Sequence, residues 1–588
     1  MSLNRYYQNE LIAFRELGQE FARRNPALAP FFDSPGRDPD VERILESFAF
    51  LTGRLHNKLD DELPEITHSL FSLLWPHYLR PIPACSILRY QPSETLSGAV
   101  SIKRGTVVES VPVEGTRCRF RTAYDTEILP LRLTDHRILE HNGKGILALH
   151  FEAMQAPLET LPITKLRFFL AGEKTIAHTI YYTLATQVRE VRVVLQSANK
   201  EERITACLSP AVVRPVGFNE DEGIFPYPAN AFPGYRIIQE YFCFTEKFFF
   251  IEVNELDKGL NQDALSPFKG VKKFQLHFVL DELPEQYESF RTENWQLFCT
   301  PVVNLFSMDS SPLLIDQHRP EYRIVPDPGR PYHFTTYSVD KVRTWTHDSK
   351  TLHYYKLFES FEHYTREDKA YYRLRIRPST QDESTESYIS IIHLPDSPHR
   401  AQEETLSLEL TCTNRLLPKH LGVGDICFHA GDAPDTISCK NITPVEPPYN
   451  PPLGDDLFWR LLSKMSLNYI PLANPIALQA VLSTYDFRAP HDRPRAKILE
   501  KNLKAIVSTA CTETGRIYNG LPVRGMQTRL VLDQKGFSCE GDMYLFGSVL
   551  NEFLALYATV NSFHQLVVNE AKLGEEYVWP ARLGRTAF

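Results

Sequence analysis

The chain has 588 residues, of which 43% are hydrophobic and 23% are charged, and its formal net charge at pH 7 is -9. This length is enough for about three or four domains with their own cores, which excludes a small fold held together by disulfides or metals. The acidic balance, and the lack of any run of lysine and arginine, argue against a nucleic-acid-binding surface.

Residues 1–84 predict an N-terminal helical bundle region. Apolar residues recur at helical spacing in three stretches; the first stops at Asn25-Pro26 and the third runs from Pro64 to Trp75-Pro76. In the second stretch, Asp38 is a candidate N-cap and Pro39 suits the first helical turn. Its apolar stripe consists of Val41, Ile44, Leu45, Phe48, Leu51, Leu55 and Leu59.

Phe50 lies off this stripe, so the middle of the second helix is apolar on more than one side. A helix that lies on the surface of a single domain does not need two apolar sides. We therefore expect other helices, from this chain or from another, to enclose it. A change of Phe48 to aspartate is then expected to unfold or dissociate the structure.

Short runs with strand character, separated by proline, glycine and asparagine, fill the chain from about residue 85 to residue 444. Several of them alternate apolar and polar residues, as half-buried strands do. We expect two β-rich modules here, at residues 85–260 and 261–444. The clearest runs are Val107-Val108, Phe120 with its arginine neighbours, Val191 to Leu195, Phe274 to Leu280 and Leu406 to Leu410.

Residues 445–588 predict a C-terminal α/β region. Asn474 is a candidate N-cap before Pro475, Thr528 to Leu532 has the pattern of a strand, and a final helix carries a broad apolar face from Leu545 to Val560. The fold class that we expect is α+β and multidomain, with helical N-terminal and C-terminal regions enclosing β-rich middle modules.

The densest aromatic segment runs from Tyr235 to Phe244 and continues at Phe248 to Phe250. We interpret it as core strands. Stacking of single-stranded nucleic acid on these rings would need more basic neighbours. Part of the segment is also suited to a protein interface, because Tyr, Phe and Arg are common interface anchors.

The sequence predicts no catalytic site, no metal and no cofactor. The ten cysteines lack CxxC pairs, which is typical of reduced core thiols. Glu65 and His68 match the ExxH spacing of di-iron bundles, but the nearby helices do not supply a second such pair, so a helix-surface pair is favoured. Gly422 and Gly424 begin a GxGxxG pattern that fails at its last glycine, which indicates a turn.

The sequence also predicts no direct insertion into a membrane. The N-terminus has no apolar signal core, and the aromatic cluster from Phe248 to Ile251 is far too short to span a bilayer. We expect a cytoplasmic protein that touches a membrane only through its partners.

A series of short motifs along the chain resembles the sequence pattern of a known protein family. In the first part of the chain they are Tyr6-Tyr7-Gln8-Asn9-Glu10-Leu11, Asp38-Pro39-Asp40-Val41-Glu42-Arg43, Phe48-Ala49-Phe50-Leu51 and Leu59-Asp60-Asp61-Glu62-Leu63-Pro64-Glu65. Later ones are Gly234-Tyr235-Arg236, Gln239-Glu240-Tyr241-Phe242, Pro301-Val302-Val303-Asn304-Leu305-Phe306, Cys412-Thr413-Asn414-Arg415 and Tyr544-Leu545-Phe546-Gly547. In this order, the motifs strongly resemble the TssF family, also called VasA or ImpG, of type VI secretion baseplate subunits. Ser47 departs from the family pattern, which leads us to expect glycine there.

The resemblance implies a structural part of a contractile injection machine, not an enzyme, with a fold similar to wedge proteins of contractile-phage baseplates. Two copies would wrap one TssG in a shared helical bundle, with TssK, TssE, the VgrG spike and adjacent wedges as neighbours. The baseplate would lie in the cytoplasm, docked at the inner-membrane complex. Structural or interface roles are expected for Phe48, Phe50, Arg236, Glu240, Asn304, Asn414 and Arg415.

Two other functions remain open from the sequence. A free-standing adaptor that binds effectors would be a soluble monomer that needs no TssG. A carbohydrate-active enzyme would need two acidic residues facing each other across a cleft, and the linear sequence does not locate such a pair.

Overall fold

The computed structural model describes residues 76–584 with gaps at 142–143, 197–201, 228–233, 269, 285, 317–318, 346–351, 359–369, 394–403, 432–435, 452, 454–473, 490, 519, 556–557, 559–560 and 573. Before residue 76 it describes residues 7, 11, 43–44, 46–54 and 71–72. The chain divides into two compact units, Met1–Leu79 with Gly454–Trp459, and Arg80–Leu453 with Arg460–Phe588. Most of the three predicted N-terminal helices, and the pair of Glu65 and His68, lie outside the described residues.

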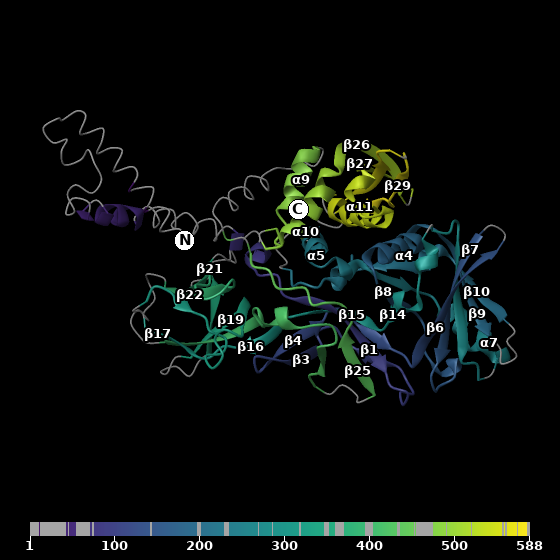
Figure 1. The fold of residues 1–588 in the computed structure, drawn as a ribbon, viewed down its shortest axis with the longest axis horizontal. Helices are drawn as coiled ribbons and strands as arrows, with labels where there is room; N and C mark the ends of the chain where they lie inside the picture. Colours follow the sequence, from purple (N-terminus) through teal and green to yellow (C-terminus); the bar gives the residue numbers. More distant parts are fainter. Residues whose placement is uncertain are drawn as a thin grey trace. The chain divides into compact units, whose positions relative to one another are not determined.

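The second unit is β-rich (Figure 1). One of its sheets has the strand order β24-β3-β4-β15-β1-β25 and brings together distant parts of the sequence. β1 pairs with β15 on one side, where Cys85 is opposite Val303, and with β25 on the other, where Leu88 is opposite Asn441. The strands are β1 (Cys85–Pro92), β3 (Val107–Val113), β4 (Thr116–Thr122), β15 (Cys299–Val303), β24 (Ile426–His429) and β25 (Ile437–Asn441), and β2 (Val100–Ile102) pairs separately with β5 (Thr126–Ile128).

Two further sheets have the orders β10-β9-β13-β7-β6 and β11-β12-β8-β14. Phe274, Leu276 and Phe278 of β13 are fully buried, because β13 has paired neighbours on both sides and apolar residues on one face. The strands are β6 (Leu131–His141), β7 (Lys144–Ala153), β8 (Leu166–Leu170), β9 (Val188–Gln196), β10 (Glu202–Leu208), β11 (Val213–Val216), β12 (Phe250–Val253), β13 (Lys273–Leu280) and β14 (Trp295–Leu297). All three sheets combine strands from before and after residue 260, the boundary expected between the two β-rich modules.

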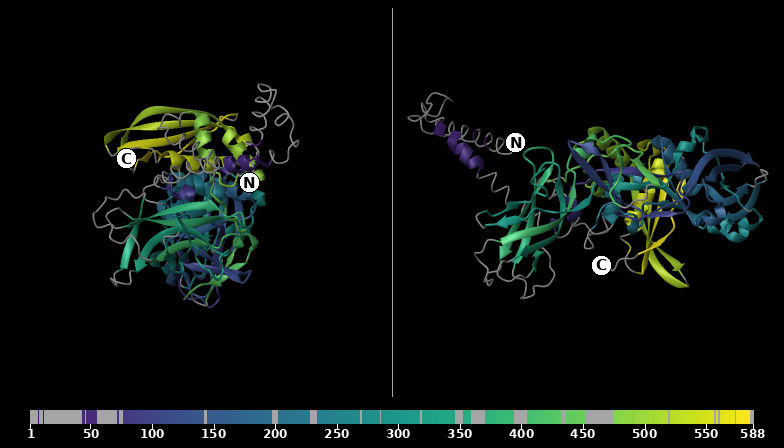
Figure 2. Two further views of the ribbon diagram at one scale, coloured as in Figure 1. Left: turned by 90° about the vertical axis from the view of Figure 1, so that its left-hand side faces the viewer. Right: turned by 90° about the horizontal axis from the view of Figure 1, so that it is seen from below.

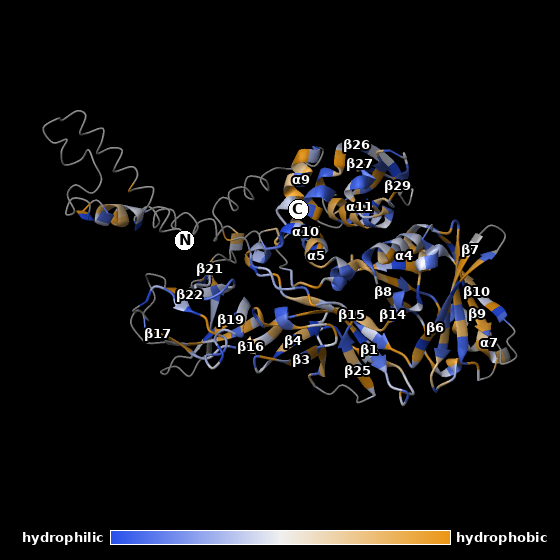
Figure 3. Cartoon of the chain, viewed as in Figure 1, coloured by the Kyte–Doolittle hydropathy of each residue, from blue (hydrophilic) through white to orange (hydrophobic). Residues whose placement is uncertain are grey.

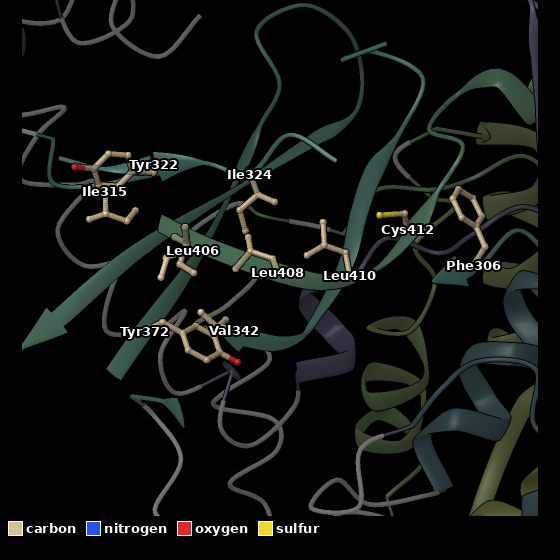
Figure 4. Packing of buried hydrophobic residues seen from close by; sticks show 11 residues of the cluster. Phe306, Ile315, Tyr322, Ile324, Val342, Tyr372, Leu406, Leu408, Leu410 and Cys412 are labelled. Carbon is tan, nitrogen blue, oxygen red and sulfur yellow. The ribbon is translucent and has the colours of Figure 1, made fainter. Parts of the chain in front are cut away.

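A separate sheet, which we call the inserted sheet, is formed by residues 306–413 and has the order β16-β23-β19-β20-β21-β22-β18. Leu406, Leu408, Leu410 and Cys412 alternate along β23 and belong to one buried cluster (Figure 4), so the strand predicted at Leu406 to Leu410 is confirmed. The strands are β16 (Phe306–Asp309), β17 (Leu313–Ile315), β18 (Tyr322–Arg323), β19 (Thr335–Trp345), β20 (Leu352–Leu357), β21 (Ala370–Pro378), β22 (Thr385–His393) and β23 (Glu404–Thr413).

The C-terminal region combines helices with a sheet of order β26-β27-β28-β29, in which β27 and β28 are parallel. Asn474 caps α9 by accepting a hydrogen bond from the backbone N–H of Ile476 at 2.9 Å, as predicted. Figure 2 shows β26 and β27 extending together as a long hairpin. The elements are α9 (Pro475–Ser483), α10 (Arg493–Lys504), β26 (Ile506–Tyr518), β27 (Leu521–Leu532), α11 (Glu540–Ala555), β28 (Ser562–Glu570), β29 (Glu576–Val578) and β30 (Arg582–Leu583).

The helices that precede this region are α4 (Lys174–Thr186), α5 (Gly234–Cys243), α6 (Asp257–Leu260) and α7 (Gln262–Leu265). Both α4 and α5 contact α11, so they join the sheets to the C-terminal region. The prediction of strands at Tyr235 to Phe244 is wrong, because this segment forms α5 and the turn that follows it. Every residue of α5 is buried. Arg236, Gln239 and Glu240 recur at the spacing of one helix face, but the aromatic and β-branched residues between them favour a strand by propensity.

Gly541 in the first turn of α11 allows a close approach to α4. A Cβ atom at this position would lie 2.2 Å from the backbone oxygen of His178. Gly541→Ala is therefore expected to push α11 away from α4 and to destabilise the protein by about 1 to 3 kcal/mol in chemical denaturation. Gly98→Ala is the control, because a Cβ atom there meets nothing within 4 Å. An equal response of the two variants would contradict this role of the α4 and α11 contact.

Candidate functional site

The seven residues singled out from the sequence lie in three places. Phe48 and Phe50 belong to the helical residues 46–54, and Arg236 and Glu240 belong to α5. Asn304, Asn414 and Arg415 lie next to one another, where the chain enters and leaves the inserted sheet. Phe48 and Phe50 are exposed, whereas the other five residues are buried. Only the first two are therefore available for contact with another chain.

The N-terminal helix has one buried side and a broad apolar side that is exposed. Ala49 and Gly53 lie one turn apart and are buried. On the opposite side, the exposed fractions are 68% for Ile44, 55% for Phe48 and 55% for Leu51. Phe50, on the flank, is also about half exposed. Figure 3 shows that hydrophobic residues line much of this helix. Of the predicted apolar stripe, the three described members Ile44, Phe48 and Leu51 are therefore largely exposed, and its other members lie outside the described residues.

Glu240 of α5 forms an ion pair with Lys247, and both side chains are completely buried. The Glu240 carboxylate also accepts hydrogen bonds from the backbone N–H groups of Ile224 at 2.7 Å and Phe225 at 3.1 Å. Burial lowers the pKa of Lys247, although the neighbouring Glu240 carboxylate opposes this shift. The pair therefore fixes α5, the segment after it and the loop at 224–225 to one another.

Arg236, one turn before Glu240, holds the preceding part of the same loop. Its guanidinium donates hydrogen bonds to the backbone oxygens of Glu220 at 2.9 Å and Asn219 at 3.0 Å. Glu222 from this loop accepts from the backbone N–H of Gly217 at 2.7 Å. These bonds pair charged groups that are almost fully buried, with only Nε of the Arg236 guanidinium left without a partner among the described residues, so Arg236 and Glu240 act inside the unit.

Aromatic rings connect α5 to the C-terminal region. Tyr235 stacks on Tyr485 with ring centroids 5.0 Å apart, and lies 5.7 Å from Phe553 of α11. Tyr241 contacts Phe546 of α11 at 6.0 Å. The helix that carries Arg236 and Glu240 is therefore also the one that the C-terminal region packs against.

Asn304 and Asn414 clamp together the two chain segments that connect the inserted sheet to the rest of the unit. The side-chain amide of Asn304 donates to Asn414 Oδ1 at 2.8 Å, and the backbone N–H of Asn414 donates to Asn304 Oδ1 at 2.7 Å. The backbone of Arg119 in β4 joins them, because its oxygen accepts from Asn304 at 2.7 Å and its N–H donates to Asn414 at 2.8 Å. We call this arrangement the asparagine clamp.

Arg415, next to the clamp, has a φ of 51° and a side chain that is 2% exposed. Its Nε and Nη2 atoms donate to the two carboxylate oxygens of Asp382 at 2.6 and 2.7 Å, and Nη2 also donates to Ser379 Oγ at 3.1 Å. The ring of Tyr332 lies 5.4 Å from the guanidinium. Arg415 thus ties the turn between β21 and β22 to the segment that leaves the inserted sheet.

The Asp382 carboxylate is held in its ionised form. Burial alone raises its pKa, but hydrogen bonds from Arg415 and Ser384 outweigh this effect and lower the pKa to about 2. The unfolded value is about 3.9, so the ionised form stabilises the folded state above pH 4, and this contribution is lost as the pH falls through about 2.

Asp382→Asn is therefore expected to make stability less sensitive to acid. Because the side chain of Asp382 is 28% exposed, its contribution is about 1 to 2 kcal/mol. Between about pH 5 and about pH 3, the unfolding midpoint of the variant should fall less than that of the natural chain. Asp281→Asn removes an exposed ion pair with Arg189 and serves as the control. If both variants follow the natural chain, Asp382 does not contribute in this way.

The sequence reasoning missed Lys247 and Asp382, the partners of two predicted residues. A signal for Lys247 was present, because it is a cation directly before three successive phenylalanines, where a charge needs a buried partner. Asp382 had no such signal, since it lies 33 residues from Arg415 in a polar stretch.

Two kinds of chemical site were sought among the described residues: a group of metal ligands, and a pair of acidic residues facing each other in a pocket. No group of three or more His, Cys, Asp or Glu side chains in this part of the chain is suited to hold a metal ion. Glu540 and Glu575 line a pocket of about 450 Å³, but the hydroxyl of Tyr577 lies between them, 2.5 Å from the first and 2.7 Å from the second. A sugar would have to displace this hydroxyl, so the arrangement is not that of an open glycosidase cleft.

No helix among the described residues is long and apolar enough to cross a bilayer. The ten cysteines are all free, and six of them are buried, whereas Cys207 is exposed.

Comparison with known proteins gives consistent results. The family model described as type VI secretion system, TssF, matches residues 1–586. The type VI secretion system component TssF1 of Pseudomonas aeruginosa is 28% identical over 625 residues, which is 98% of this chain and 98% of the relative.

Two solved structures contain similar chains. One is the type VI secretion system TssK-TssF-TssG baseplate subcomplex, with 30% identity, a TM-score of 0.76 and coverage of 93% of this chain and 99% of that chain. The other is the baseplate complex from the type VI secretion system, with 26% identity, a TM-score of 0.66 and coverage of 99% of both chains.

Proposed function

This chain belongs to the TssF family of type VI secretion baseplate components, and from that membership we propose that two copies of it wrap one TssG chain to form a wedge of the baseplate. TssK, TssE, the VgrG spike and adjacent wedges are the neighbours of this wedge. A solved TssK-TssF-TssG subcomplex contains a similar chain, which supports TssK and TssG as the first partners to test.

The observation that supports the shared bundle is the exposed apolar side of the N-terminal helix. Ile44, Phe48 and Leu51 are each more than half exposed on the side opposite Ala49 and Gly53. Covering such side chains contributes about 1 kcal/mol or more for each of them, since about half of their surface is still exposed. Helices of TssG and of a second copy are the occupants that we propose for this side.

The proposed mechanism is mechanical. The wedges form a ring in the cytoplasm, at the inner-membrane complex, and the ring holds one geometry while the sheath assembles and another on firing. Free energy stored in contacts between chains takes the place of catalysis. The buried groups around Glu240 and the asparagine clamp support this role, because they tie distant segments of the second unit to one another.

The two copies in a wedge should differ in their domain arrangement, because one TssG chain cannot offer two identical surfaces. Structures of both copies in one wedge would test this point. If they superposed as rigid bodies over their whole length, this part of the proposal would fail.

The first experiment is mass measurement by light scattering after co-expression with TssG. A wedge should have twice the 67.6 kDa of this chain plus the mass of one TssG, and the chain alone should dissolve poorly or self-associate. A well-behaved monomer that does not bind TssG would contradict the proposal. If that monomer bound an effector, it would favour the free-standing adaptor.

A further inference from the structure

Three sheets of the second unit present edge strands to one pocket of about 440 Å³. The edges are β25, β6 and β14, which supply Ser438, Leu131 to Leu133 and Trp295 to Leu297. β14 contacts both β1 and β6, and Figure 1 shows these strands near one another. The volume is in the range of ordinary ligand pockets, and edge strands carry backbone groups that can pair with an extended chain.

Arg89 of β1 brings a positive charge without a partner to this pocket. Its guanidinium makes no hydrogen bond or ion pair with any residue that the structure describes, and its Nε atom is buried. The other charges in the lining are Arg132, which pairs with Glu152 at 2.7 Å, and Glu293. A partly buried cation without a partner is costly, which points to a carboxylate as the missing group.

Two more polar atoms in the wall of the pocket lack hydrogen bonds. Nε1 of Trp295, a residue that is 2% exposed, is a donor without an acceptor, and Oε1 of Gln296 is an acceptor without a donor. The Arg89 and Gln296 side chains are both partly exposed in the wall of the pocket, and Nε2 of Gln296 donates to the backbone oxygen of Glu293 at 2.6 Å. A ligand that pairs with both Arg89 and Gln296 Oε1 offers a donor as well as a carboxylate.

We propose that this pocket, which we call the Arg89 pocket, binds an extended acidic segment of a protein partner. A carboxylate of the segment pairs with Arg89, and a backbone N–H donates to Gln296 Oε1. A fully deprotonated inorganic anion such as sulfate has no such donor, whereas an acidic peptide carries backbone N–H groups beside its carboxylates. The choice of a baseplate protein as the source rests on the proposed function.

A photo-crosslinking experiment on the assembled wedge tests this proposal. Ser438, which is exposed on β25 and lines the pocket, is replaced by p-benzoyl-phenylalanine in the full chain, co-expressed with TssG and TssK. Irradiation should join the chain to a partner segment that contains Asp or Glu. Arg89→Met should reduce the yield at least about tenfold, the scale of one charge-assisted hydrogen bond. Lys440→Met, also on β25 but outside the pocket, should leave the yield unchanged.

Cross-links only within this chain, an equal yield with Arg89→Met, or no cross-link in an assembled wedge would each overturn the proposal. Light scattering of the same sample keeps the two proposals apart, because a correct wedge mass without cross-links contradicts only the pocket. If no wedge forms, short overlapping peptides from TssG and TssK are probed with the isolated full chain. Binding of acidic peptides that is lost with Arg89→Met supports the pocket, and its absence overturns it.

Discussion

Replacing Lys247 by methionine is expected to lower the free energy of unfolding by about 3 to 5 kcal/mol, because it leaves the buried Glu240 carboxylate without a cation. Neither side chain of this pair is exposed to solvent. The unpaired carboxylate should weaken the packing of α5. The loop at 224–225 and the helix α11, which both contact α5, should loosen as a result. Urea denaturation measures the total loss, and hydrogen exchange of α5 amides measures the local one.

A double variant distinguishes the cost of an unpaired buried charge from the cost of the contacts that the Lys247 side chain loses. Glu240→Gln combined with Lys247→Met removes both charges and keeps an oxygen that can accept from Ile224 and Phe225. The double variant should therefore be more stable than Lys247→Met alone. Lys258→Met, which removes an exposed pair with Glu255, should change the stability by less than about 1 kcal/mol. If Lys247→Met cost no more than Lys258→Met, the buried pair would not be a main support of the fold.

Phe48→Asp is expected to weaken the complex with TssG much more than it destabilises the isolated chain. Phe48 is 55% exposed in this chain, so a charge at this position costs less here than it does when another helix covers the rest of the side chain. Covering a carboxylate in an apolar bundle is unfavourable by at least about 2 kcal/mol, which weakens binding roughly 30-fold or more. Light scattering of the co-expressed proteins measures the loss, and thermal unfolding of the chain alone checks the fold.

Two neighbouring positions make this test specific. Ser47→Asp adds the same charge to the same helix at an exposed polar position beside the apolar stripe, and should weaken the complex less than Phe48→Asp. Ala49→Asp adds it to the buried side and should destabilise the helix even without TssG. Equal binding by Phe48→Asp and the natural chain would show that the exposed apolar side is not the TssG contact.

Much of the secondary structure followed from local patterns. The alternation along Phe274 to Leu280 and Leu406 to Leu410 correctly indicated strands, since side chains of a strand point to opposite faces in turn. Asn474 and Pro475 correctly marked the start of α9, because capping depends only on groups a few residues apart. The ordered motifs also identified the family, which the match over residues 1–586 confirms.

The tertiary structure alone decided which distant groups meet. Arg415 and Asn414 were singled out from the sequence, but Asp382 and Asn304 became their partners only through the course of the inserted sheet, over 33 and 110 residues. The helix at α5 was missed because its many aromatic residues favour a strand, and its polar face of Arg236, Gln239 and Glu240 finds its partners only in the folded chain. Local propensity is set by neighbours along the chain, whereas pairing and burial are set by neighbours in space. The partner of Glu240 and the exposure of Phe48 therefore became known only from the folded chain.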